Sequence, residues 1–135
     1  MSTLDDLIHV QRQLQEQLGY DFDTMSDEHR VKYIRDMVLA LTHEAHELLD
    51  TVQWKPWVTA YRGDAIDGVE FEKELADIFT FLLNLALVAG ISGNALEYAY
   101  DQKNRINQRR ASSNYDGNWA LKRSTVDGEP DTMPV

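Results

Sequence analysis

The sequence predicts an all-α fold. Hydrophobic residues recur at helical spacing in four segments, helix-start and helix-stop residues bound these segments, and no segment alternates as a strand does. A chain of 135 residues with 43% hydrophobic content has the size and composition of one folded domain with a modest core. We therefore expect a bundle of four to five helices over residues 1–117, followed by a polar and mobile tail over residues 118–135.

The first two predicted helices carry clear N-terminal signals. The first runs from about Leu4 to Leu18, with Thr3 as its N-cap and Asp6 in the capping-box position. The second starts after Ser26, another N-cap residue, and two acidic residues in its first turn complement the helix dipole. The hydrophobic stripes consist of Leu4, Leu7, Ile8, Leu14 and Leu18 in the first helix, and of Val31, Ile34, Val38, Leu41, Ala45 and Leu48 in the second.

The third and fourth predicted helices follow a loop that contains proline and glycine. The third covers roughly residues 69–89, is apolar on nearly all sides in its second half, and ends at Gly90. Ser92 or Asn94 caps the fourth, which runs to about Arg110. One short bundle cannot cover a helix as apolar as the third, so we expect a homodimer or a homotetramer built as a dimer of dimers.

Composition and charge exclude several classes of protein. The net charge of −10 argues against binding to a nucleic acid polymer, which requires an excess of Lys and Arg, but it allows a single nucleotide held through metal ions. The absence of cysteine excludes disulfides, thiolate zinc sites and iron–sulfur clusters. The N-terminus has no signal-peptide pattern, and the apolar stretch of residues 78–91 is too short to span a bilayer. We therefore expect a cytoplasmic protein with no membrane partner.

Two pairs of acidic residues are the most informative feature. Glu44 and Glu47 lie in the second predicted helix, and Glu74 and Asp77 lie in the third; the i, i+3 spacing puts each pair on one helix face. That face is hydrophobic in both helices, because it also carries Met37, Ala40, Leu41 and Leu48 in the second and Phe71, Ile78, Phe81 and Leu85 in the third. Carboxylates converging on a bundle core repel one another and lose hydration. The pattern predicts that hard divalent cations lie between the pairs.

The fourth predicted helix carries a second set of polar residues. Lys103, Asn107 and Arg110 are spaced i, i+4, i+7 and therefore share one face. A lone Lys or Arg near a helix C-terminus is explained by the helix dipole. Because this set shares its face with core-type residues, we interpret it as a phosphate clamp opposite the carboxylates.

Aromatic and amide residues suggest where a base would bind. Trp54 and Trp57, in a loop with proline, would either stack a base or cover the small core, and the residues favour the two interpretations equally. Gln11 and Gln15 stand in the hydrophobic stripe of the first helix, where buried amides need partners. The edge of a base would satisfy these amides, and so would a hydrogen bond between helices.

Other interpretations compete with the metal-dependent one. A di-iron bundle requires Glu-x-x-His, and here His43 and His46 fail that spacing and point away from Glu44, so we assign them to the surface or an interface. Glu70 is better explained by the dipole at the start of its helix than by the acid cluster. The main alternative is a non-enzymatic helical oligomer, in which the acids form ion pairs with Lys73, Arg105 or Arg109.

The order of these motifs resembles the all-α nucleoside-triphosphate pyrophosphohydrolase superfamily, which includes MazG-type enzymes and dimeric dUTPases. The resemblance extends from about Leu7 to Trp119 and rests on Glu44-x-x-Glu47, Glu74-x-x-Asp77, the segment KNRINQRR at 103–110, and the loop that contains Tyr115. Gln11 and the segment Trp54-Lys55-x-Trp57 are most similar to the dimeric dUTPase branch. Pro56 and Asn114 depart from that branch, where an aromatic residue and a glycine are usual, and the chain is as compact as phage-type members.

The resemblance implies a Mg²⁺-dependent hydrolase that converts a deoxynucleoside triphosphate and water into a monophosphate and diphosphate, in the cytosol of a bacterium or of a phage-infected host. The four acids would hold two or more Mg²⁺ ions, for which Mn²⁺ would substitute, and Glu47 would orient the attacking water or take its proton. The phosphate chain would be bound by Lys103, Asn107, Arg110 and Tyr115, and the base, uracil or guanine, by Gln11, Gln15, Trp54 and Trp57.

Overall fold

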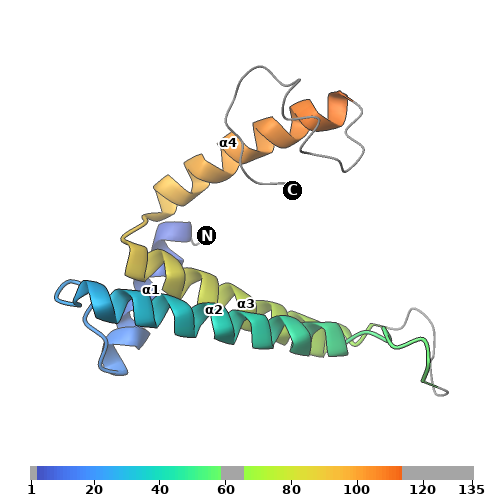
Figure 1. Cartoon of the computed structure of the whole chain (residues 1–135), viewed down its shortest axis with the longest axis horizontal. Helices are drawn as coiled ribbons and strands as arrows, with labels where there is room; N and C mark the ends of the chain where they lie inside the picture. The colour runs from blue at the N-terminus through green and yellow to red at the C-terminus, as the bar shows by residue number, and fades with distance from the viewer. Residues whose placement is uncertain (1–2, 59–65, 114–135) are drawn as a thin grey trace. The chain divides into compact units, whose positions relative to one another are not determined.

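The computed structural model describes residues 3–58 and 66–113 of the chain. These residues form four helices, namely α1 (Leu4–Gln17), α2 (Asp27–Asp50), α3 (Gly68–Ala89) and α4 (Gly93–Ser112) (Figure 1). In the described part of the chain there is no strand, and Val52 and Ile66 form only an isolated antiparallel bridge. The predicted all-α class is confirmed.

The chain divides into two compact units. The first, Met1–Gly93, contains α1, α2 and α3, and the second, Asn94–Val135, contains α4 apart from its first residue. The predicted domain boundary at residue 117 and the predicted tail over residues 118–135 lie outside the described residues. That division of the chain stays a prediction.

The helix ends follow the local signals of the sequence. The Thr3 hydroxyl accepts a hydrogen bond from the Asp6 backbone N–H at 3.1 Å, and the Asp6 carboxylate accepts one from the Thr3 N–H at 2.9 Å, which completes the predicted capping box. Ser26 caps α2 by accepting from the N–H of His29. Gly90 ends α3 with a φ of +69°, in the left-handed region that favours glycine.

The start of α4 decides between the two predicted caps. The helix begins at Gly93, directly after Ser92, so Asn94 is its second residue and the prediction of Asn94 as N-cap was wrong. The N–H of Gly93 donates to Asp5 Oδ1 at 2.6 Å. A Cβ on Gly93 would lie 2.6 Å from the Asp5 backbone nitrogen, so the close approach of these two segments requires glycine.

The first unit is built on the antiparallel pair of α2 and α3, with α1 packed against α3 (Figure 1). Near the start of α2, the Arg30 guanidinium donates to the carbonyl of Val88 at 2.6 Å and to the carbonyl of Phe22. Further along α2, Met37 Sδ accepts a hydrogen bond from Asn84 at 3.5 Å. Continued along the pair, this antiparallel register brings the second half of α2 beside the first half of α3, which is where the acid pairs lie.

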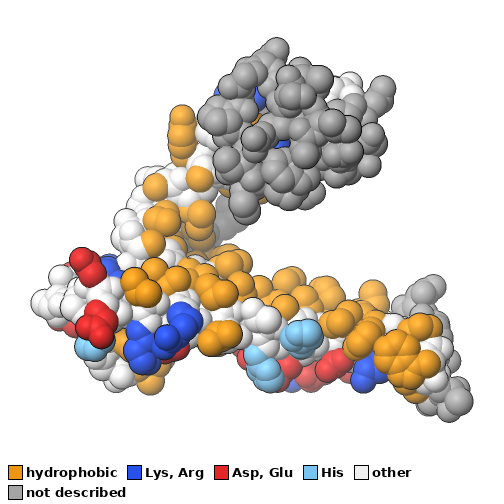
Figure 2. Space-filling model, viewed as in Figure 1, with side chains coloured by type: hydrophobic (Ala, Val, Ile, Leu, Met, Phe, Trp, Pro, Cys, Tyr) orange, Lys and Arg blue, Asp and Glu red, His pale blue; other side chains and the backbone are white. Residues whose placement is uncertain are grey.

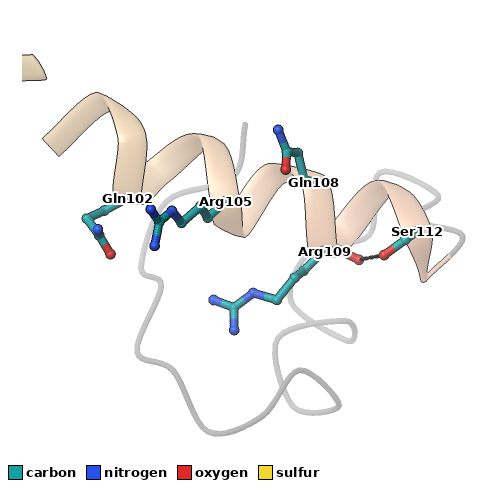
Figure 3. A pocket seen from close by; sticks show the side chains of 5 residues that line it. All are labelled: Gln102, Arg105, Gln108, Arg109 and Ser112. Atoms are coloured by element: carbon teal, nitrogen blue, oxygen red, sulfur yellow. Dashed lines mark hydrogen bonds between the residues drawn. The ribbon is translucent and has the colours of Figure 1, made fainter. Parts of the chain in front are cut away.

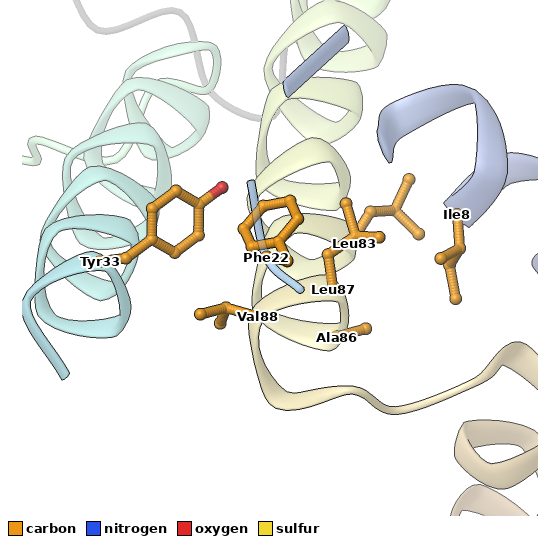
Figure 4. Packing of buried hydrophobic residues seen from close by; sticks show 7 residues of the cluster. All are labelled: Ile8, Phe22, Tyr33, Leu83, Ala86, Leu87 and Val88. Carbon is orange, nitrogen blue, oxygen red and sulfur yellow. The ribbon is translucent and has the colours of Figure 1, made fainter. Parts of the chain in front are cut away.

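A small hydrophobic core occupies the other end of the α2–α3 pair. Figure 4 shows its members, Ile8, Phe22, Tyr33, Leu83, Ala86, Leu87 and Val88. The ring of Tyr33 packs edge-to-face against Phe22, with centroids 5.3 Å apart. Burial raises the pKa of the Tyr33 hydroxyl, which donates to Gln15 Oε1 at 2.7 Å. The core thus contains a buried tyrosine hydroxyl that has a hydrogen-bond partner, the amide of Gln15.

Hydrophobic stripes remain exposed on all three helices of this unit. They consist of Leu7, Val10 and Leu14 on α1 with Leu18 at its C-cap, Val31, Ile34 and Val38 on α2, and Leu75, Phe79 and Leu82 on α3. Figure 2 shows hydrophobic side chains gathered along the body formed by α2 and α3. The single chain therefore leaves much of the predicted stripe of α2 uncovered, and Val31 is 68% exposed.

Among the described residues no single helix is long and apolar enough to cross a membrane. Of the helices described, only the pair of α3 and α4, taken together, has the length and composition of a membrane span.

Candidate metal centre and nucleotide site

Three carboxylates from two helices meet between α2 and α3. One ligand oxygen from each of Glu44, Glu74 and Asp77 lies within 4.8 Å of the others. The i, i+3 spacing of Glu74 and Asp77 and the antiparallel register of the two helices together produce this convergence. Glu44 and Glu74 are half-buried, and Asp77 is exposed, so the cluster opens to solvent at Asp77.

The electrostatics of the cluster disfavour three ionised acids without a cation. Burial, followed by hydrogen bonding with and repulsion from Glu44 and Glu47, raises the pKa of Glu74 to about 7. Burial also raises the pKa of Glu44, and repulsion from Glu47 and Asp77 adds to the effect. A cation between the helices would oppose both shifts, because it favours the ionised carboxylates.

The donor set fits a hard divalent cation. Glu44 Oε2 and Glu74 Oε2 are buried and have no hydrogen-bond partner among the described residues. Buried charged oxygens without partners are costly, and metal coordination is one of the few ways to satisfy them. Carboxylate oxygens are the ligands that Mg²⁺ prefers. The residues present therefore fit the predicted metal.

Glu47 lies beside this trio and has a partner of its own. Its charge acts on both Glu44 and Glu74, which places it at the edge of the cluster. Glu47 Oε1 lies 3.0 Å from His43 Nε2, one helical turn earlier on α2. His43 and His46 are exposed, and the contact between His43 and Glu47 was not predicted. The i, i+4 spacing of these two residues was the available signal.

The ion pair between Lys73 and the acid cluster, one of those required by the non-enzymatic alternative, does not form among the described residues of the first unit. Lys73 pairs with Glu70 at 3.2 Å, within the first turns of α3, and not with Glu74. Among the described residues of the first unit, no Lys or Arg forms an ion pair with Glu44, Glu74 or Asp77. Arg105 and Arg109 lie in the second unit. Salt bridges between the helices of the first unit therefore do not explain the carboxylates of the cluster.

The predicted base-stacking residues form a compact aromatic group. Trp54 and Trp57 pack edge-to-face, with ring centroids 5.7 Å apart and ring planes at 88°. Lys55 Nζ lies 5.4 Å from the centroid of Trp54, and Trp54 Nε1 donates to Asp50 Oδ1 at 3.0 Å. Trp57 is 69% exposed, so the pair does not act as a lid over the core of this single chain. The contacts of Lys55 and Asp50 were not predicted.

The two predicted amides both have partners inside the first unit. Gln11 Nε2 donates to Asn84 Oδ1 at 2.8 Å, which joins α1 to α3. Gln15 Oε1 accepts from the Tyr33 hydroxyl, which joins α1 to α2. Both glutamines are buried, and these bonds supply the helix-to-helix partners that the sequence left as one of two interpretations.

The predicted phosphate clamp lies on one side of α4, in the second unit. Lys103 and Asn107 are half-buried and Arg110 is 5% exposed. The amide oxygen of Asn107 is buried without a partner among the described residues, which leaves hydrogen-bonding capacity for a ligand. Tyr115 lies outside the described residues. The predicted opposition of this face and the acid cluster stays a prediction.

A different side of α4 is also basic and was not predicted as a site. Figure 3 shows Arg105 and Arg109 projecting to the same side of the helix as Gln102. Together with Gln108 and Ser112 they line a pocket of about 590 Å³. Ser112 Oγ donates to the Arg109 carbonyl at 2.9 Å and so closes the last turn of α4.

Comparison with protein families decides the class of the protein. A model of the family described as dUTPase matches residues 3–95. The chain belongs to this dUTPase family. Membership makes it a nucleotide pyrophosphatase, and it confirms the resemblance to the all-α nucleoside-triphosphate pyrophosphohydrolases. No curated protein matches the chain.

The part of the chain that matches the dUTPase family contains both acid pairs, both buried glutamines and the aromatic group. It ends before Lys103, so the phosphate clamp lies outside the matched segment. The non-enzymatic alternative is overturned by the family assignment. The dUTPase family typically depends on Mg²⁺, and the cluster of Glu44, Glu74 and Asp77 is the candidate site for that ion.

Proposed function

We propose that the chain is a Mg²⁺-dependent deoxynucleoside-triphosphate pyrophosphohydrolase, which converts a dNTP and water into a dNMP and diphosphate. The observation that supports this proposal most strongly is the meeting of Glu44, Glu74 and Asp77, two of which have a buried oxygen without a partner. The match to the dUTPase family supplies the class of substrate. Uracil is the first expectation for the base, and guanine is the second.

The carboxylate cluster would hold the metal. Glu44, Glu74 and Asp77 would be ligands, with Glu47 beside them, for two or more Mg²⁺ ions that Mn²⁺ can replace. When bound, Mg²⁺ supplies the positive charge that offsets the phosphates and lowers the pKa of water. The helices contribute a pre-formed site, because the three oxygens already lie close together in the folded chain.

Glu47 is the best candidate for handling the attacking water. It lies at the edge of the cluster, and its Oε1 contacts His43 at 3.0 Å, which restricts its rotation. A carboxylate held in this way can accept a hydrogen bond from water and then its proton. No covalent intermediate with the protein is required, and the reaction depends on positioning and electrostatics.

Binding of the substrate would use the remaining predicted residues. Lys103, Asn107 and Arg110 would bind the phosphate chain through charge-assisted hydrogen bonds, together with Tyr115. Trp54 and Trp57 would stack the base. Gln11 and Gln15 could contact the base in two ways. The edge of the base could replace Asn84 or Tyr33 as hydrogen-bond partner, or it could bond to the amide groups that these two contacts leave unused.

A side-by-side assay of dUTP, dCTP, dGTP and dATP with Mg²⁺ tests the proposal. The expected products are the monophosphate and diphosphate in equal amounts, with dUTP or dGTP as the fastest substrate and no turnover in excess chelator. Release of orthophosphate alone, or no turnover of any common nucleoside triphosphate, would overturn the proposal.

The exposed hydrophobic stripes support assembly into a homodimer or a homotetramer. Their members repeat every three or four residues and therefore form continuous faces on α1, α2 and α3. A second copy of the chain would cover them, since closed symmetric homo-oligomers are the commonest assemblies. A compact single chain at micromolar concentration in sedimentation velocity would contradict this. We propose the cytosol as the compartment, where nucleoside triphosphates are available.

A further inference from the structure

We infer that Asp50 is a positioning residue, which fixes the orientation of the Trp54 indole and so sets the affinity for the base of the substrate. The inference rests on the proposed function, because it takes Trp54 as a base-stacking residue. It starts from one contact, the hydrogen bond of 3.0 Å that Trp54 Nε1 donates to Asp50 Oδ1. Neither residue has a part in the metal cluster.

Asp50 occupies an unfavourable place in the helix. It is the last residue of α2, where the dipole disfavours a negative charge, and the last turn of α2 contains no basic residue. None of the ion pairs described for α2 includes Asp50. The partner that the structure gives to this carboxylate is the Trp54 indole. This contact explains an acidic residue at a position where the helix dipole disfavours one.

The contact between Asp50 and Trp54 joins α2, the helix that carries Glu44 and Glu47, to the loop that follows it. Glu47 and Asp50 are spaced i, i+3 on α2, so Asp50 follows the acid pair by about one turn on nearly the same side. The start of the loop is held to its end by the bridge between Val52 and Ile66 and by the hydrogen bond from the Asp67 N–H to the Thr51 carbonyl at 3.3 Å. Trp54 is therefore tied to the same end of the α2–α3 pair as the carboxylates.

The other contacts of the Trp54 indole do not fix its side-chain rotation, so the hydrogen bond to Asp50 can restrict that rotation. Trp54 is 40% exposed; Trp57 packs against it, and Lys55 lies over its ring. Trp57 and Lys55 are themselves exposed loop residues, whereas Asp50 is part of a long helix. A hydrogen bond at Nε1 selects one rotation of the ring. Because apparent affinity falls with the fraction of molecules in the competent conformation, loss of the bond weakens stacking without touching the phosphates or the metal.

The test compares steady-state kinetics of Asp50→Ala, Asp50→Asn and Trp54→Phe with the wild type. Asp50→Ala should raise KM by the same factor for dUTP and dGTP and leave kcat unchanged. The expected factor is about three if about a third of the molecules keep the Trp54 ring in the orientation that stacks the base. Asp50→Asn keeps Oδ1 as an acceptor and should bring KM back toward the wild-type value. Trp54→Phe lacks the N–H, so adding Asp50→Ala to it should have no further effect.

Two controls separate positioning from charge and from the phosphate site. Glu72→Gln removes one negative charge from an exposed position on α3 and should leave KM unchanged. The inhibition constant of imidodiphosphate, which has no base, should be the same for wild type and Asp50→Ala. An unchanged KM in Asp50→Ala, or an equal change in Asp50→Asn, overturns the inference while the hydrolase proposal stands. A wild type without turnover of any nucleoside triphosphate overturns both.

Discussion

Glu44 and Glu74 face one another across the seam between α2 and α3, and each has one buried carboxylate oxygen, Oε2, without a hydrogen-bond partner among the described residues. Ligand oxygens of the two residues lie within 4.8 Å. Local helix formation does not require this arrangement, and the repulsion between the two carboxylates opposes it. The metal-free chain therefore carries a folding cost that a bound cation would remove, which leads to the first two predictions.

Replacement of Glu74 by glutamine should separate function from stability. Glu74→Gln removes a carboxylate from the cluster, so we expect turnover to fall by about 100-fold or more. The metal-free variant should unfold at a higher temperature than the metal-free wild type, because a like charge has been removed. Glu72→Gln, with the same change of charge at an exposed position of α3, should change neither quantity. A destabilised Glu74→Gln protein would indicate that the carboxylate has a stabilising partner.

The stability of the metal-free protein should depend on pH through the same residue. The pKa of Glu74 is raised from an ordinary value of 4.5 to about 7, so between these values the folded state binds more protons than the unfolded state. Stability from this group is then present at low pH and is lost as pH rises toward 7. Urea unfolding in chelator should show that the advantage of Glu74→Gln over wild type grows across this range. An advantage that is constant with pH would contradict the assignment.

Arg30 should be a major contributor to the stability of the α2–α3 pair. Its guanidinium donates to the carbonyls of Val88 and Phe22, so Arg30→Met leaves two carbonyls without their donor. We expect a loss of roughly 2–4 kcal/mol in the free energy of unfolding, since hydrogen bonds from charged groups are stronger than neutral ones. Arg35→Met, which removes only an exposed contact with Asp36, should cost less than about 0.5 kcal/mol. Denaturant unfolding of the two variants measures the difference, and equal losses would refute it.

Gly93 should tolerate no side chain, whereas Gly68 should. A Cβ on Gly93 would lie 2.6 Å from the backbone nitrogen of Asp5 and 2.7 Å from its Oδ1, so Gly93→Ala should cost about 1–3 kcal/mol. Nothing lies within 4 Å of a Cβ on Gly68, the first residue of α3, so Gly68→Ala should be neutral or slightly stabilising. Thermal unfolding of both variants provides the measurement. A stable Gly93→Ala protein would show that Asp5 moves away at little cost.

The sequence predicts the local features of this chain well, because they depend on neighbouring residues. The Thr3 capping box, the Ser26 cap and the end of α3 at Gly90 each follow from one residue and its near neighbours. The acid pairs could be placed on faces for the same reason, since i, i+3 spacing defines a face within one helix.

Contacts between helices could not be predicted in the same way. α2 has two hydrophobic faces, and the sequence does not say which one a single chain covers; the structure buries Tyr33 and leaves Val31 exposed. The partner of Gln11 is Asn84, 73 positions away, and no local spacing points to it. His43 with Glu47 is different, because both residues lie in one helix and their i, i+4 spacing was visible in the sequence. Trp54 lies in the loop after α2, so that rule does not point to its contact with Asp50.

The most direct test of the central claim is the affinity for Mn²⁺, measured by calorimetry or by electron paramagnetic resonance of the free ion at about pH 7.5 without nucleotide. We predict saturable binding to the wild type, an affinity weaker by about tenfold or more in Glu74→Gln, and an unchanged affinity in Glu72→Gln. Equal Mn²⁺ affinities for the wild type and Glu74→Gln would contradict the assignment of Glu44, Glu74 and Asp77 as the metal centre.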